Sequence, residues 1–380
     1  MSVWLDHIGF GIVIPLLPFY AESFGASPTV IGMLIGLYSL MQLFSPALWG
    51  SLSDYIGRRL ALLLNIAGTG LSFLLFGLAQ SLWMLFAARA LSGATGASIV
   101  IAQSYIADIT TPENRASRLG FLEAAVILGF ILGPVVGSAL AGRGGAVNFG
   151  SPGLAAALLS LFTFCLAFIA LPKQKSRPSR LTKWNTQALL TNLVGVLQRP
   201  MVGQLMVVAF CAMSALVACQ ATIALWCEYR FGWGFKEFSY FIIFSGLLSA
   251  CAQIALTGPL TRWFGEVNIL FAGLVGMGLG LLLLPFSTSL PLLLGAMAFV
   301  ICGQALSSPT NTSLLCQLAG VKQQGKTLGL AQSVAGLASF TGAIWGGFMF
   351  EAIGPGAPYW GGALLILGAI AFGKRQITGV

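Results

Sequence analysis

Three ionisable residues stand inside long apolar stretches of this 380-residue chain: Asp6, Arg89 and Glu123. An ionised side chain at membrane depth costs roughly 2.5–3.5 kcal/mol or more, so residues in such places usually have a function. A carboxylic acid there can take up and release a proton, whereas arginine keeps its charge and needs an acceptor or water. The three residues are therefore candidates for a proton-coupling site.

Each candidate also has a simpler interpretation, which the sequence leaves open. Only five residues precede Asp6, so it could be a boundary charge at the cytoplasmic interface. Arg89 could form a structural ion pair, with Asp6 or Glu123 as its partner, or extend toward the cytosol. Glu123 stands a turn or two inside its segment and could be interfacial. His7 points about 100° away from Asp6 on a helix, which favours a packing role.

The composition requires a membrane around these residues. Hydrophobic residues make up 57% of the chain, charged residues only 8%, and the mean hydropathy is +0.90. Soluble domains carry about 25% charged residues. The net charge of +9 does not indicate a nucleic-acid partner, because the basic residues lie between apolar runs. With one histidine and no CxxC among seven cysteines, we expect no metal and no cofactor.

Polar residues divide the chain into twelve apolar segments, and one spanning helix needs about 20 apolar residues. The predicted fold is an all-α membrane protein with twelve transmembrane helices in two pseudo-symmetric six-helix halves. The expected domains are an N-terminal bundle at 1–172, a cytoplasmic linker at 173–200 and a C-terminal bundle at 201–380. The predicted segments are 3–21, 29–52, 60–79, 81–106, 116–141, 153–172, 201–227, 236–261, 268–286, 290–318, 327–350 and 357–373.

Lysine and arginine are distributed unevenly between the two sides of these segments. Fifteen of the 19 fall on one side, Arg143, Arg230 and Lys236 fall on the other, and Arg89 lies inside a segment. The positive-inside rule then places both termini and the linker in the cytoplasm. We expect a multi-pass protein of the cell (inner) membrane, and no cleaved signal peptide, because the first segment lacks a basic n-region and a cleavage site.

One short polar phrase occurs twice, as GSLSDYIGRR at 50–59 and GPLTRWFGEV at 258–267. The glycines coincide, but the charges are inverted, with Arg262 in the place of Asp54. A second repeat relates 118–140 to 327–349 and again aligns glycines. Two related six-helix halves are typical of a transporter in which one half rocks against the other around a midplane site.

The phrase GSLSDYIGRR resembles the loop 2–3 signature of the major facilitator superfamily. The segment at 89–116 resembles the fourth-helix motif of its proton-coupled members, with Arg89 as the buried arginine. LDHIGFGIVIPLLP at 5–18 resembles the first helix of the twelve-helix drug:proton antiporters, including the tetracycline-resistance-type exporters. The fifth-helix antiporter motif, whose usual final glycine is Ser138 here, is matched by Gly120, Gly129, Gly133, Pro134 and Gly137.

The resemblance implies a secondary active transporter, a proton-coupled antiporter that exports amphipathic or lipophilic small molecules by alternating access. It also implies a latch on the cytoplasmic face, although a solvated face that only sets topology is an alternative. The antiporter glycines could equally serve packing alone. The expected cytoplasmic-gate residues are Gly50, Asp54, Gly57, Arg58, Arg59, Asp108 and Arg115.

Scattered amides and aromatic residues in the apolar segments suggest a large, mainly apolar cavity suited to amphipathic molecules. Each of these residues alone could equally be a packing residue. The candidate substrate-binding residues are Tyr38, Gln42, Gln103, Phe130, Gln220, Gln253, Gln304, Asn311, Gln332 and Trp345.

Other function classes stay open or lose support. A transporter of one specific metabolite, by uniport or symport, is an alternative, and a non-transporting receptor or assembly factor on the same scaffold is another. No GxxxxGK[ST] phosphate loop occurs, so ATP-driven transport lacks support. No nucleophile or metal constellation indicates an enzyme. The expected partners are a small-molecule substrate, protons and the lipid bilayer, and we expect a functional monomer.

Overall fold

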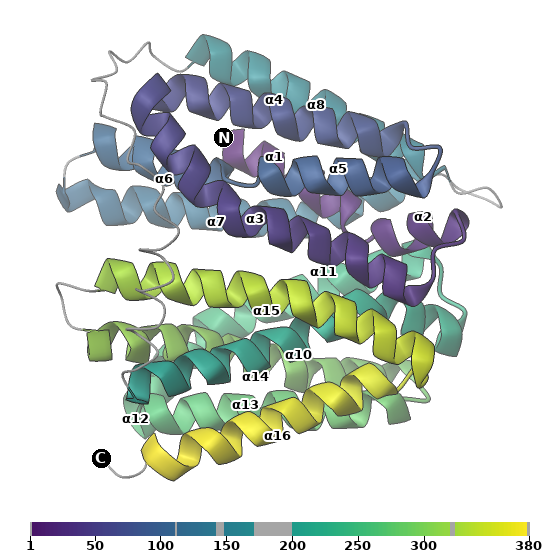
Figure 1. Ribbon diagram of the computed structural model, residues 1–380, viewed down its shortest axis with the longest axis vertical. Helices are drawn as coiled ribbons and strands as arrows, with labels where there is room; N and C mark the ends of the chain where they lie inside the picture. The colour runs from purple at the N-terminus through teal and green to yellow at the C-terminus, as the bar shows by residue number, and fades with distance from the viewer. Residues whose placement is uncertain (1, 111, 142–147, 171–199, 320–323, 378–380) are drawn as a thin grey trace. The chain divides into compact units, whose positions relative to one another are not determined.

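The computed structural model describes residues 2–110, 112–141, 148–170, 200–319 and 324–377 (Figure 1). Within these ranges the chain is helical almost throughout and contains no strand. The predicted linker at 173–200 lies almost entirely outside the described residues. The side chains of Asp108 and Arg115 also lie outside the described part of the chain.

The helices of the predicted N-terminal bundle are α1 (Ser2–Val13), α2 (Leu17–Ser23), α3 (Pro28–Ile56), α4 (Arg58–Gly77), α5 (Leu82–Ala94), α6 (Ser98–Ile109), α7 (Pro112–Leu140) and α8 (Gly150–Ala170). Two of the six apolar segments in this bundle are each divided into two helices, α1 with α2 and α5 with α6.

The helices of the predicted C-terminal bundle include a short π-helix and a short 3₁₀-helix. They are α10 (Pro200–Phe231), α11 (Phe235–Ala252), η1 (Gln253–Thr257), α12 (Gly258–Phe264), α13 (Glu266–Leu283), η2 (Leu284–Phe286), α14 (Leu290–Ala319), α15 (Gln324–Ala352) and α16 (Ala357–Ile377).

The chain forms two compact units, which are described separately below. The first unit comprises Met1–Ala26, Leu37–Lys183 and Trp233–Gly246. The second unit comprises Ser27–Gly36, Trp184–Gly232 and Leu247–Val380. Helices α3 and α11 therefore each contribute residues to both units.

The membrane-spanning helices agree with the apolar segments. Among the described residues, ten helices are long and apolar enough to cross a membrane, or eleven if the bent α1–α2 pair is one span. The predicted twelfth segment, at 357–373, coincides with α16. The prediction of an all-α membrane protein is confirmed.

Three predicted segments are interrupted where the backbone cannot continue a regular α-helix. Helices α1 and α2 meet at 43°, and Pro15, which has no amide hydrogen, lies in the break. The fourth segment breaks at 95–97, between α5 and α6, and Gly96 is the middle residue of this break. The π-helix η1 precedes Pro259, which cannot donate to a carbonyl one turn earlier.

The repeated polar phrase forms the same sharp turn in both of its copies. Gly57 separates α3 from α4 with φ of 93°, and Gly265 separates α12 from α13 with φ of 79°. Residues other than glycine rarely adopt this left-handed backbone conformation. The glycines at these positions are therefore required by the turn.

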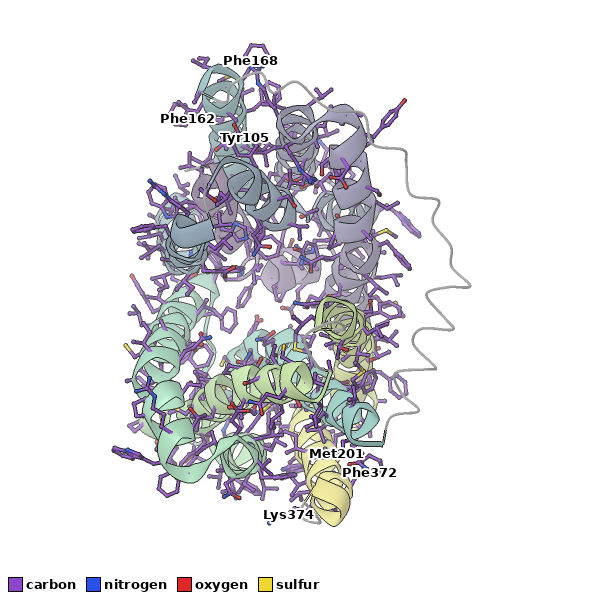
Figure 2. All side chains as sticks on the ribbon, turned by 90° about the vertical axis from the view of Figure 1, so that its left-hand side faces the viewer. Tyr105, Phe162, Phe168, Met201, Phe372 and Lys374 are labelled. Carbon is purple, nitrogen blue, oxygen red and sulfur yellow. The ribbon has the colours of Figure 1, made fainter. Side chains whose placement is uncertain are left out.

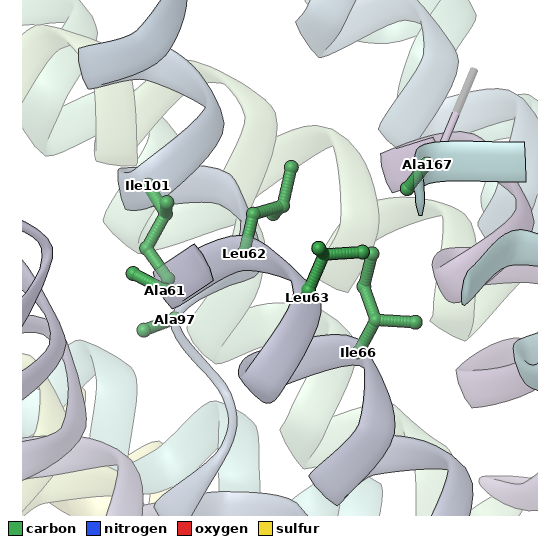
Figure 3. Packing of buried hydrophobic residues seen from close by; sticks show 7 residues of the cluster. All are labelled: Ala61, Leu62, Leu63, Ile66, Ala97, Ile101 and Ala167. Atoms are coloured by element: carbon green, nitrogen blue, oxygen red, sulfur yellow. The ribbon is translucent and has the colours of Figure 1, made fainter. Parts of the chain in front are cut away.

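The first unit has a core built by small and branched apolar side chains. Figure 3 shows one cluster, in which α4 residues such as Leu62 and Ile66 are buried with Ile101 of α6 and Ala167 of α8. Two other side chains of α8, Phe162 and Phe168, project outward and are 56% and 57% exposed (Figure 2). Exposed aromatic rings on a spanning helix indicate a surface that faces lipid.

Candidate functional site

Asp6 is buried in α1, with 9% of its surface exposed. Ser98, the first residue of α6, donates its hydroxyl to Asp6 Oδ2 at 2.7 Å. The other carboxylate oxygen, Oδ1, is buried and has no hydrogen-bond partner among the described residues. An acid with one oxygen held and one open can accept a proton or a water molecule. Ser98 was not singled out from the sequence, because a lone hydroxyl in an apolar segment is common.

Arg89 is buried in α5, with 5% of its surface exposed. Its guanidinium carbon lies 4.8 Å from the ring centre of Tyr38 and 6.0 Å from that of Phe10. Cation–π contacts of this kind stabilise a desolvated cation by about 2 kcal/mol. No ion pair joins Arg89 to Asp6 or Glu123 within the described residues. Aromatic faces, which the sequence pattern did not indicate, therefore surround this charge in place of an acid.

Glu123 differs from Asp6 in its environment. Its side chain is exposed on α7, and its Oε1 accepts a hydrogen bond from Gln103 Nε2 at 3.2 Å. Gln103 and Glu123 thus form one polar pair between α6 and α7. Of the two acids considered for proton coupling, Asp6 is the one withdrawn from solvent.

Three candidate substrate-binding residues of the first unit are connected to Arg89, directly or through a neighbouring side chain. Gln42 Nε2 donates to the hydroxyl of Tyr38 at 3.1 Å. Phe130 of α7 packs edge-on against Phe10 at 5.6 Å and against His7 at the same distance. His7 itself bonds Val3 O through Nδ1 at 2.7 Å. Tyr38 therefore contacts the buried arginine directly, Gln42 bonds the hydroxyl of Tyr38, and Phe130 packs on Phe10, the other ring beside the arginine.

This arrangement predicts unequal effects of two substitutions of Tyr38. Tyr38→Phe keeps the ring under the guanidinium, so we expect thermal stability close to wild type. Tyr38→Leu removes the aromatic face, and we expect it to destabilise the protein by about 1–2 kcal/mol. Thermal unfolding in detergent measures both effects. Equal destabilisation by the two variants would contradict the cation–π contact and assign the role to the hydroxyl.

The antiporter-motif glycines hold α7 against α1. A Cβ on Gly129 would lie 2.7 Å from His7 Cβ, and one on Gly133 would lie 2.5 Å from the backbone of Gly11. A Cβ on Gly137 would lie 3.2 Å from Ile12 O, whereas one on Gly120 would meet nothing within 4 Å. Gly129 and Gly133 are thus required for the close contact with the helix that carries Asp6, and Gly137 lies against the same helix.

The second unit contains a cavity of about 370 Å³ between α10, α13, α14 and α15. Three of the predicted substrate-binding residues line it, namely Gln304, Asn311 and Gln332. Drug-sized ligands typically occupy pockets of roughly 300–1,000 Å³ that are mainly apolar and carry a few polar groups. The cavity fits that description.

The other predicted lining residues of the second half lie elsewhere. Trp345 donates its indole N–H to Ser214 Oγ at 2.8 Å, which holds α15 against α10. Gln220 and Gln253 are exposed and do not line the cavity of the second unit.

The two copies of the repeated phrase make different polar contacts. In the first copy, Asp54 pairs with Arg58 at 2.5 Å, one helical turn away across Gly57. Arg59 donates to Phe168 O at 2.5 Å and lies over the ring of that residue.

In the second copy the acidic residue, Glu266, follows the turn glycine, whereas Asp54 precedes it in the first copy. Glu266 accepts from Ser313 Oγ at 2.9 Å and from Gln317 Nε2 at 3.0 Å, both on α14. The first copy therefore has an ion pair near the turn, and the second copy has a carboxylate bonded to a neighbouring helix.

The described residues contain no group of three or more His, Cys, Asp or Glu side chains that could hold a metal ion. None of the seven cysteines, all of which lie in the described ranges, forms a disulfide.

Comparison with known proteins gives consistent results. The sequence model of the Major Facilitator Superfamily matches residues 1–266 and 231–375. The tetracycline resistance protein of class C from Escherichia coli is 33% identical over 98% of this chain and 92% of its own length. Multidrug resistance protein 1 of Bacillus subtilis is 27% identical over 92% of this chain and 88% of its own.

Two solved structures have the same fold. The human organic anion transporter MFSD10 (TETRAN) aligns with a TM-score of 0.71 at 23% identity, covering 98% of this chain and 96% of its own. The nucleoside transporter NupG aligns with a TM-score of 0.81 at 13% identity, covering 98% of both chains.

Proposed function

The chain belongs to the Major Facilitator Superfamily, and from this membership we propose that it is a proton-coupled antiporter that exports amphipathic or lipophilic small molecules by alternating access. The names of its relatives, which are tetracycline and multidrug resistance proteins, support this substrate class. The observation that carries the proposal is the burial of Asp6 with one carboxylate oxygen open. A buried acid of this kind can exchange protons as its surroundings change.

In the proposed cycle, a proton on Asp6 and the cargo favour different states of the protein. Such coupling requires only that each ligand bind the two states with different affinity. Helix α1 carries Asp6 and packs closely on α7 through Gly11 and Gly133, so a shift of either helix changes the surroundings of the acid. In this proposal Arg89, buried on α5, supplies the fixed positive charge of the coupling site.

The direct test is transport by the purified protein in proteoliposomes, with tetracycline as one probe and ethidium as another. We expect a pH gradient to drive both probes against their concentration gradients, and nigericin, which collapses the gradient, to abolish the effect. A transport rate that does not change with the pH gradient would contradict proton-coupled antiport and favour the alternative of uniport of a specific metabolite. Transport in the same direction as the proton would favour symport.

The proposed gate is asymmetric, because only the first copy of the repeated phrase contains the Asp54–Arg58 pair. Asp54→Asn removes an ion pair at an element that switches between states, and even a small energy biases two states of nearly equal free energy. Arg262→Gln changes an exposed residue of the second copy.

We therefore expect Asp54→Asn to reduce the transport rate several-fold and Arg262→Gln to leave it near wild type. Initial rates in proteoliposomes measure both effects. If the transport rate falls equally in the two variants, or falls more in Arg262→Gln, then the inverted charges do not make the gate asymmetric.

The proposed orientation places both termini and the linker in the cytoplasm, in the inner membrane of a bacterial cell. The distribution of lysine and arginine supports it, with fifteen of the 19 on one side. We further propose that residues 1–172 and 201–380 are the two moving halves of a functional monomer. A C-terminal fusion to alkaline phosphatase should be inactive and one to green fluorescent protein should be fluorescent; the opposite pattern would contradict the orientation.

A further inference from the structure

The cavity in the second unit is lined by apolar and uncharged polar side chains. Its described lining contains no ionisable side chain. The polar groups that line it are all uncharged, and they come from α14 and α15: Gln304, Ser307, Ser308, Asn311, Thr312 and Gln332. A charged group entering the cavity would lose its hydration without gaining an ionic partner, which is costly. An uncharged group that forms hydrogen bonds would be accepted.

One polar atom in this lining is unsatisfied. Asn311 is only 7% exposed, and its Oδ1 is buried with no hydrogen-bond partner among the described residues. A buried acceptor without a partner costs about 1–3 kcal/mol. Hydroxyls next to it on α14 are already used, since Thr310 donates to Leu306 O at 2.6 Å and Thr312 donates to Ser308 O at 3.0 Å. A hydrogen-bond donor that enters the cavity would give this oxygen a partner.

We propose that this cavity is a binding subsite for an uncharged, hydrogen-bond-donating part of the cargo, such as a hydroxyl, phenol or amide N–H, and that Asn311 Oδ1 is its acceptor. The apolar side chains of α10 and α13, including Met213 and Leu274, surround the hydrocarbon body of that group. The inference rests on the proposed function in one respect, since the bound molecule is taken to be transported.

The test uses two probes with the same aromatic body, 2-naphthol and 2-methoxynaphthalene. Both are uncharged at neutral pH, and only the naphthol has a hydroxyl to donate. Equilibrium dialysis measures their affinities for the purified full chain in lipid nanodiscs, without any proton gradient. Empty nanodiscs give the partition of each probe into lipid, which is subtracted. A hydrogen bond predicts about threefold to tenfold tighter binding of naphthol to wild type.

Substitutions then assign the preference to Asn311. Asn311→Leu should bring the affinity ratio of the two probes to about one. Asn311→Gln keeps an uncharged amide oxygen as acceptor and should keep the naphthol preference. Thr310→Val, on the same helix but outside the cavity lining, is the matched control and should behave as wild type. Size-exclusion profiles and helical circular dichroism verify that each variant is folded.

Several results would overturn the subsite. Equal affinity of the wild-type protein for the two probes would overturn it, whether or not the variants fold. A wild-type ratio that persists in Asn311→Leu would also overturn it. A ratio lost equally in Asn311→Gln and Asn311→Leu would contradict the role of Asn311 as acceptor. Because binding is measured without a gradient, wild type that binds naphthol selectively but transports nothing would contradict the proposed function and leave the subsite intact.

Discussion

Asp6→Asn is expected to abolish proton-driven accumulation while leaving the protein folded. Asparagine has nearly the shape of aspartate, and its side-chain oxygen can still accept the hydrogen bond from Ser98 that Asp6 Oδ2 accepts at 2.7 Å. The variant cannot release or take up a proton at this position. Coupling free energies of about 1–3 kcal/mol correspond to roughly 5–150-fold effects, so the ratio of transport with and without a pH gradient should fall from this range to about one.

The measurement is tetracycline transport in proteoliposomes at several pH values, together with exchange of labelled for unlabelled tetracycline at equal pH. We expect the rate of wild type to depend on pH and that of Asp6→Asn to be independent of pH. Exchange should persist in the variant, because it needs cargo movement without net proton movement. The matched control is Glu22→Gln, which neutralises an exposed acid of α2 in the same unit. Unaltered pH dependence in Asp6→Asn would refute the role of this acid.

Glu123 provides a second comparison within the same assay. Its carboxylate is exposed and bonded by Gln103, so Glu123→Gln should retain dependence on the pH gradient. If Glu123→Gln loses that dependence and Asp6→Asn keeps it, the coupling acid lies on α7. The proposal of a proton-coupled antiporter would then survive with a different residue.

The fold could be predicted from the sequence because apolar segments of spanning length leave few alternatives. The breaks in three of these segments could not be located so easily. Pro15 and Pro259 were visible as helix-breaking residues, but a proline in a spanning helix such as Pro134 or Pro309 is also accommodated without a break. Whether a proline ends a helix, bends it or is tolerated depends on neighbouring helices that supply packing and hydrogen bonds.

The candidate site was predictable in part, for a similar reason. A charge in an apolar segment is conspicuous, so Asp6 and Arg89 stood out. Their surroundings depend on tertiary contacts, and neither Ser98 nor the ring of Tyr38 was identifiable as a partner beforehand. Amides in apolar helices carry still less information, because Asn311 lines a cavity while Gln220 does not, although both stand in long apolar segments.

Gly133→Ala should destabilise the protein strongly, whereas Gly120→Ala on the same helix should not. A Cβ on Gly133 would lie 2.5 Å from the backbone of Gly11, so α1 and α7 must separate to accept it. Overpacking of this kind costs about 1–3 kcal/mol. A Cβ on Gly120 meets nothing within 4 Å, and alanine favours a helix over glycine by about 0.5–1 kcal/mol.

The internal repeat provides an equivalent pair of glycines in the second unit, which allows the same comparison there. Gly342 aligns with Gly133, and a Cβ there would lie 2.5 Å from Ser214 O of α10; Gly329 aligns with Gly120 and is open in the same way. We expect Gly342→Ala to lower the unfolding temperature as Gly133→Ala does, and Gly329→Ala to leave it unchanged or raise it. Only Gly133→Ala disturbs the helix that carries Asp6, so it should also lose more gradient-driven transport than Gly342→Ala at equal loss of stability. Equal loss of transport in the two would mean that the glycine contact serves packing alone.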